Sequence, residues 1–212
     1  DVVRALADKH PISLVNSLNE YRIDGQRTGA FEVCDVLGDA PDVLCIPVGN
    51  AGNINAYWLG FQAYRDAEIS TRLPRLYGFQ AAGAAPLVNG APVDKPETVA
   101  TAIRIGKPAR RAQAMDAMGA SGGGVAAVTD EQILAAYTLL AREEGVFCEP
   151  ASAASVAGLI ARAEAGDFRP GEKVVCVLTG HGLKDPDTAI GACEPVRRLP
   201  ADISAIEEAV FG

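Results

Sequence analysis

Phosphate binding is the first chemistry that this sequence suggests. The candidate loop consists of Gly49, Asn50, Ala51, Gly52 and Asn53. The pentapeptide follows an apolar run typical of a buried strand and precedes an amphipathic helical pattern. Glycine lets the backbone turn and approach a ligand closely, and asparagine tolerates left-handed backbone. Free amides at a helix start, at the positive end of the helix dipole, favour an anion. By itself the pentapeptide also fits a tight turn without a ligand, and it matches neither the Walker loop nor the GxGxxG signature.

Two further polar segments follow predicted strands. The glycine-rich loop that begins at Thr179 comes after the last apolar run of the chain, and Asn16, Ser17 and Arg22 come after the run 12–15. The amide, hydroxyl and guanidinium groups of this second segment suit a phosphate or a carboxylate. Open α/β sheets bind ligands at the carboxyl ends of their strands. Either segment alone is typical of solvated surface, but with residues 49–53 they indicate one ligand site.

Composition excludes several classes of function. The 212 residues include 19 basic and 27 acidic side chains, a net charge of −8, and the doublet Arg110-Arg111 is short. Nucleic-acid binding needs clustered cations, and a membrane span needs about 20 consecutive apolar residues, so we expect neither partner. The five cysteines form no CxxC pair and only two histidines are present. We therefore expect no metal site, and reduced thiols in a cytoplasmic protein.

The elements that must position these residues alternate between two hydrophobic periods. Short apolar runs with β-branched residues alternate with helical patterns, which predicts an α/β fold with a mostly parallel sheet flanked by helices. The polar stretch 16–28 is expected to be a linker or a site loop. The predicted strands are 12–15, 43–48, 76–80, 125–128 and 173–178. The predicted helices are 2–10, 28–37, 54–67, 97–104, 109–118, 129–144 and 151–165.

Six segments that cover nearly the whole chain carry a resemblance to a known family. In order along the chain they are VNSLNEYRIDGQRTGAFE, PVGNAGNINAYW, QAAGAAPLV, TAIRIGKPA, GVFCEPASAASVAGL and VLTGHGLKDPDTA. Together they resemble the threonine synthases, pyridoxal-phosphate enzymes of fold type II in the tryptophan-synthase-β superfamily. The resemblance implies a lyase that converts O-phospho-L-homoserine and water to L-threonine and phosphate.

The resemblance also implies a domain organisation and an assembly. Residues 1–24 would be the last strand and hinge of the small domain, and residues 25–212 an incomplete large cofactor domain of fold type II. The full-length protein is expected to be a homodimer with pyridoxal 5'-phosphate as its cofactor and no metal.

Residue roles follow from the matched segments. Residues 49–53 would bind the cofactor phosphate, and Thr179 would hydrogen-bond the pyridine nitrogen. Asn16, Ser17 and Arg22 would contact the phosphate of the substrate. Glu149 either places a carboxylate near this site or belongs to an ordinary helix start.

The sequence also departs from the family pattern. It reads Asn19-Glu20 where the family has Asn-Pro, which adds a negative charge near the proposed anion site. The motif with the Schiff-base lysine is absent, and none of the five lysines stands in a matching context, although Lys184 lies near Thr179. We therefore expect the carboxyl-terminal portion of such an enzyme, inactive alone. A threonine or serine dehydratase and a non-catalytic binding module remain alternatives.

Overall fold

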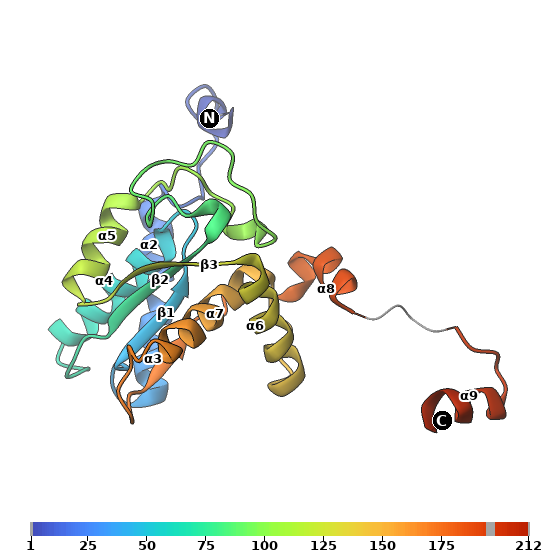
Figure 1. The fold of residues 1–212 in the computed structure, drawn as a ribbon. Coiled ribbons are helices and arrows are strands. Elements are labelled where there is room, and N and C mark those ends of the chain that lie inside the picture. The colour runs from blue at the N-terminus through green and yellow to red at the C-terminus, as the bar shows by residue number, and fades with distance from the viewer. Residues whose placement is uncertain (1, 194–197, 212) are drawn as a thin grey trace.

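A parallel sheet between two layers of helices forms the body of the protein (Figure 1). The computed structural model describes residues 2–193 and 198–211, and within them the sheet has four strands in the order β3-β2-β1-β4. All three strand pairings are parallel, which confirms the predicted α/β class. The strands are β1 (Val43–Pro47), β2 (Arg75–Ala81), β3 (Gly124–Val128) and β4 (Val174–Cys176).

Helices cover both faces of the sheet. Helices α6 and α7 pack on one face, and α3, α4 and α5 pack on the other, whereas α9 lies apart from the layered body (Figure 1). The helices are α1 (Val2–Ala7), α2 (Glu20–Gln26), α3 (Thr28–Leu37), α4 (Gly52–Asp66), α5 (Arg111–Ala120), α6 (Asp130–Glu143), α7 (Pro150–Glu164), α8 (Pro186–Ala192) and α9 (Ile203–Phe211), with 3-10 turns η1 (Ala82–Ala84), η2 (Thr101–Ile103) and η3 (Gly182–Lys184).

Strand β1 explains why a continuous apolar run forms a strand here. All of its residues are buried. Val43 and Cys45 belong to the core beneath α7, whereas Leu44 and Ile46 belong to the core beneath α4. Because successive side chains of a strand point to opposite faces, a strand that is covered on both sides must be apolar throughout.

Several helix ends lie where local sequence signals placed them. Gly38 follows α3 with a left-handed φ of 76°, as its C-terminal position requires. Helix α6 begins with the predicted capping box, in which the Thr129 hydroxyl accepts from the Gln132 amide and the Gln132 side chain accepts from the Thr129 amide. These ends are determined by residues close in sequence.

The predicted strand at 12–15 is wrong. Ile12 and Val15 are 51% and 75% exposed, and none of the described strands pairs with this segment. An apolar run forms a strand only where a neighbour satisfies its amides and carbonyls. The expected linker 16–28 instead contains α2, because the Asn19 side chain caps that helix through the Arg22 amide. The proposed domain boundary at residue 24 lies inside this helix.

The predicted helix at 97–104 is also wrong, since only the turn η2 forms there. The carboxylate of Asp130, at the start of α6, accepts hydrogen bonds from the Thr98 hydroxyl and the Val99 amide, at 2.5 and 3.0 Å. The Glu97 amide donates to the carbonyl of Gly83. These contacts hold the segment in a non-helical path that local propensity does not reveal.

The end of the chain differs from expectation as well. Strand β4 has three residues where the sequence predicted 173–178, and α8 and α9 were not predicted. Helix α8 had recognisable signals, because Asp185 caps it through the Thr188 amide and Pro186 occupies its first turn.

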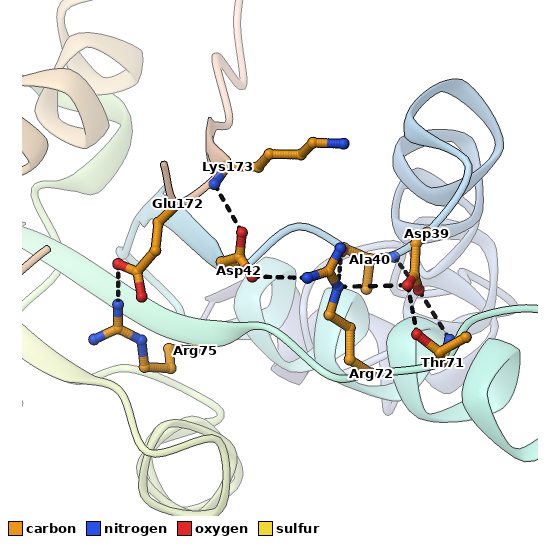
Figure 2. A network of polar contacts seen from close by, with 8 residues as sticks. All are labelled: Asp39, Ala40, Asp42, Thr71, Arg72, Arg75, Glu172 and Lys173. Carbon is orange, nitrogen blue, oxygen red and sulfur yellow. Dashed lines mark hydrogen bonds and ion pairs between the residues drawn. The ribbon is translucent and has the colours of Figure 1, made fainter. Parts of the chain in front are cut away.

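A polar network ties together the amino ends of β1, β2 and β4 (Figure 2). The Asp42 carboxylate accepts from the amide of Lys173 at 2.8 Å and from the guanidinium of Arg72 at 2.9 Å. Arg75 at the start of β2 pairs with Glu172, which precedes β4, at 2.7 Å. The network therefore fixes the register of the three strands at their amino ends.

Asp39 closes the same network beside α3. Its carboxylate accepts from the Thr71 hydroxyl at 2.6 Å and from the amides of Thr71 and Ala40 at 2.9 and 2.8 Å. The Thr71 hydroxyl, with these amides and the charge of Arg72, holds the pKa of Asp39 below its usual value. A lowered pKa in the folded state means that Asp39 stabilises the fold above the unfolded pKa of about 3.9, and less as the pH falls through the folded value.

We predict that Asp39→Asn lowers the free energy of unfolding by about 1 kcal/mol at pH 7, with a difference from wild type that shrinks below about pH 4. Urea unfolding at several pH values measures this difference. The control is Asp116→Asn on α5, because Asp116 is exposed and has no polar partner among residues 2–193 and 198–211. An Asp39 effect that persists unchanged at low pH would contradict the assignment.

Candidate functional site

A cavity of about 280 Å³ lies at the carboxyl ends of β1 and β4. All the residues that the sequence singled out as a site line it, although they come from three separate segments. Its lining from these segments is Asn16, Ser17, Arg22, Gly49, Asn50, Ala51, Gly52, Asn53 and Thr179. The structure therefore brings together the proposed cofactor and substrate positions in one place.

The loop 49–53 connects the end of β1 to the start of α4. Ala51 occupies the position before the helix with a left-handed φ of 65°, so the strained residue is an alanine and not one of the asparagines expected to take this conformation. No side chain caps the helix. The amides of its first turn have no partner within the helix and carry the positive end of its dipole, so they can bind an anion.

The two glycines of the loop are closely packed. A Cβ atom on Gly49 would lie 3.2 Å from the carbonyl oxygen of Ala102 in η2. A Cβ atom on Gly52 would lie 3.0 Å from the Cβ and 3.1 Å from the Oγ of Ser17. The loop is therefore enclosed by η2 on one side and by the segment that contains Ser17 on the other.

Thr179 is held in place by a serine of α7. The hydroxyl of Ser152, fully buried in α7, lies 3.0 Å from that of Thr179 and accepts from the Gly180 amide at 2.8 Å. The carbonyl of Gly180 in turn accepts from the amide of Glu149 at 2.9 Å. Helix α7 thus fixes the loop after β4, with the Thr179 hydroxyl at the cavity.

Asn16, Ser17 and Arg22 enter the cavity from outside the sheet. The Asn16 side chain accepts from the amide of Leu18 at 3.0 Å, which makes a local turn. The guanidinium of Arg22 donates to the carbonyl of Val15 at 3.1 Å and is otherwise exposed. Its remaining donors are free to meet an anion.

Two ionisable groups whose role the sequence left open also line the cavity. Glu149 is 7% exposed, and its carboxylate has no polar partner in the described part of the chain. Lys184 in η3 is exposed at the cavity mouth. Pro150, which opens α7, was a signal that Glu149 stands at a helix start. Ala102 and Ile103 complete a wall that sequence analysis missed, because it expected a helix there.

The fold and the cavity together define a class of protein: an α/β protein with a polar cavity at the carboxyl ends of its parallel strands, beside the start of a helix. Among the described residues no group of three or more His, Cys, Asp or Glu side chains is arranged to hold a metal ion. None of the described helices combines the length and apolar character needed to cross a membrane.

Comparison with known families identifies the chain more closely. The family described as pyridoxal-phosphate dependent enzyme matches residues 1–180. The chain belongs to this family, whose cofactor is pyridoxal phosphate.

Relatives with high identity are threonine synthases, which confirms the resemblance seen in the sequence. The protein from Synechocystis is 60% identical over 188 residues, which cover 89% of this chain and 49% of the relative. The protein from Halalkalibacterium halodurans is 57% identical, with 92% of this chain and 54% of the relative covered. The protein from Mycobacterium tuberculosis is 56% identical, with 98% and 58% covered. The chain thus spans about half the length of these curated relatives.

Solved structures share the fold at low identity. A threonine deaminase from Solanum lycopersicum superposes with a TM-score of 0.62 at 21% identity, over 79% of this chain and 48% of that structure. A second threonine deaminase, from T.th., gives a TM-score of 0.66 at 20% identity, over 85% and 60%. This likeness confirms the predicted fold class.

We predict that Ser152→Ala lowers the free energy of unfolding by about 1–3 kcal/mol, because it leaves the Gly180 amide without its acceptor. The matched control is Ser155→Ala, one turn further along α7. The Ser155 hydroxyl donates to the carbonyls of Ser152 and Val177, and it has no hydrogen bond to Thr179 or Gly180. Urea unfolding is expected to show a loss for both variants, but only Ser152→Ala should accelerate hydrogen exchange at Gly180. Equal exchange at Gly180 in the two variants would contradict this role.

Proposed function

We propose that this chain forms the cofactor-binding part of a threonine synthase, an enzyme that converts O-phospho-L-homoserine and water to L-threonine and phosphate. One observation supports it most directly: the loop 49–53 at the start of α4, the Thr179 hydroxyl after a neighbouring strand, and the side chains of Asn16, Ser17 and Arg22 share one cavity. Identity of 56–60% to proteins named threonine synthase supports the same reaction.

The residues of the cavity fit pyridoxal phosphate at both of its polar ends. Residues 49–53 would bind the phosphate through the amides at the start of α4, in a cradle that side chains at Gly49 and Gly52 would narrow. The Thr179 hydroxyl, oriented by Ser152, would hydrogen-bond the pyridine nitrogen. When bound, pyridoxal phosphate supplies an electron sink for carbanion chemistry on an amino acid. Because a neutral hydroxyl does not protonate the ring nitrogen as a carboxylic acid would, Thr179 restrains delocalisation of charge into the ring.

Asn16, Ser17 and Arg22 would bind the phosphate of the substrate. The reaction breaks the bond between Cγ and the phosphate oxygen and adds water at Cβ, so the leaving group is a phosphate dianion. A guanidinium presents several donors to such an anion in a fixed plane. Arg22 would therefore hold the phosphate while the bond breaks and stabilise the charge that it carries away.

The likeness to threonine deaminases does not favour a dehydratase. It lies at 20–21% identity and concerns the fold alone. A dehydratase substrate carries no phosphate, so a second phosphate site beside the loop 49–53 is expected for a synthase and not for a dehydratase.

We predict that this chain binds pyridoxal phosphate at least about tenfold more tightly than pyridoxal, because only the former carries the dianion that the α4 amides attract. The fluorescence of Trp58, the one tryptophan of the chain and a residue of α4, provides the signal. Inorganic phosphate is expected to compete. Equal affinity for the two compounds, or no competition by phosphate, would contradict the cofactor assignment.

Arg22→Ala tests the substrate assignment in a full-length version of the protein. The KM for O-phospho-L-homoserine is expected to rise by about tenfold or more, since a charge-assisted contact to phosphate is lost. The content of pyridoxal phosphate, measured by its absorbance, should stay constant. Arg27→Ala is the control, because Arg27 pairs with Asp24 and does not line the cavity. Loss of cofactor from the Arg22 variant would count against the assignment.

A further inference from the structure

Arg110 is a buried arginine that lies directly before α5 and outside the lining of the cavity. Its side chain is 8% exposed. Its guanidinium donates to the carbonyl of Ser17 through Nε at 2.5 Å, and through Nη2 to the carbonyl of Leu18 at 3.4 Å and the carboxylate of Glu20 at 2.7 Å. One side chain thus makes three contacts with a segment about 90 residues earlier in the chain.

The main chain of Arg110 contacts the other half of the site. Its amide donates to the carbonyl of Asn50 at 3.2 Å. Arg110 is therefore hydrogen-bonded through its backbone to the loop 49–53 and through its side chain to residues 17–20, which are called the Ser17 segment below. These are the two segments that Gly52 brings into close contact at the cavity.

The segment before α2 has little other support. None of residues 2–22 is buried. Every hydrogen bond that the structure describes between residues 2–22 and a residue beyond 30 is made by the side chain of Arg110. The remaining polar contacts of this segment join near neighbours in sequence. The described hydrogen bonds that link this segment to the rest of the fold are therefore those of Arg110.

Glu20 has a defined place in this arrangement. It stands where the resembled family has proline, and its negative charge lies near the proposed anion site. In the structure its carboxylate pairs with the Arg110 guanidinium, which balances its charge. The unusual Glu20 thus completes the set of acceptors around one guanidinium.

We propose that Arg110 is a positioning residue that holds Ser17, and with it Asn16 and Arg22, at the distance from the loop 49–53 that a phosphorylated substrate requires. The inference rests on the proposed function for the identity of that substrate. Arg110 acts through the main chain of its neighbours and does not touch the ligand. A lysine cannot replace it, because a single ammonium group cannot reach two carbonyls and a carboxylate as the planar guanidinium does.

Hydrogen exchange on this chain tests the positioning directly. Arg110→Met retains the apolar stem and the backbone amide that contacts Asn50, but removes all three donors to the Ser17 segment. The amides of residues 18–23 are expected to exchange about tenfold faster, and those of residues 49–53 within about twofold of wild type. The control is Arg111→Met, since Arg111 donates to the carbonyl of Gly90 and contacts neither segment. Unchanged exchange at residues 18–23 in Arg110→Met would overturn the proposal.

A kinetic measurement on a full-length version separates positioning from general stability. Arg110→Met is expected to raise the KM for O-phospho-L-homoserine by about tenfold while kcat and pyridoxal phosphate content change by less than about twofold. Arg110→Lys should resemble Arg110→Met, and Glu20→Gln, which preserves both carbonyl contacts, should have a smaller effect. A lysine variant with wild-type KM would overturn the role of the guanidinium.

The two measurements keep this inference distinct from the proposed function. If wild-type protein does not accept O-phospho-L-homoserine, the proposed function fails, and the exchange experiment alone decides whether Arg110 orders the segment. If Arg110→Met accelerates exchange without changing KM, the proposed function stands and the positioning role is overturned.

Discussion

The start of α4 is the constraint on which the site depends. Strand β1 is buried on both faces, so its end cannot shift, and Ala51 then turns the chain through a left-handed conformation directly into the helix. That turn leaves the first amides of α4 without helical partners and directs them to the cavity. An anion satisfies these amides better than any neutral group, because the helix dipole adds to each hydrogen bond.

The amino ends and the carboxyl ends of the strands differ in function. At the amino ends, Asp42, Arg72 and Arg75 form paired charges that join three strands (Figure 2). At the carboxyl ends, β1 and β4 continue into loops whose residues line the cavity. The strand register that is set at the amino ends therefore determines where Thr179 and the loop 49–53 lie at the carboxyl ends.

Each group at the cavity is supported by a residue that does not bind the ligand. Ser152 orients Thr179 from α7, and η2 packs against Gly49. Arg110 holds the Ser17 segment from the start of α5. This arrangement suits the proposed pair of phosphate sites, one for the cofactor and one for the substrate, because their separation would be set by the protein before either binds.

The sequence by itself determined the sheet class, the buried strand β1, the capped start of α6 and three of the polar segments that line the cavity, because these depend on local periodicity, turn chemistry and recognisable segments. Only the tertiary structure decided that residues 12–15 are not a strand, that 97–104 is held open by Asp130, and that Ser152 and Arg110 support the site. The outcomes for 97–104, Ser152 and Arg110 rest on hydrogen bonds between residues up to 93 positions apart. Local spacing carries no information on such contacts, since they form only when the fold brings the partners together.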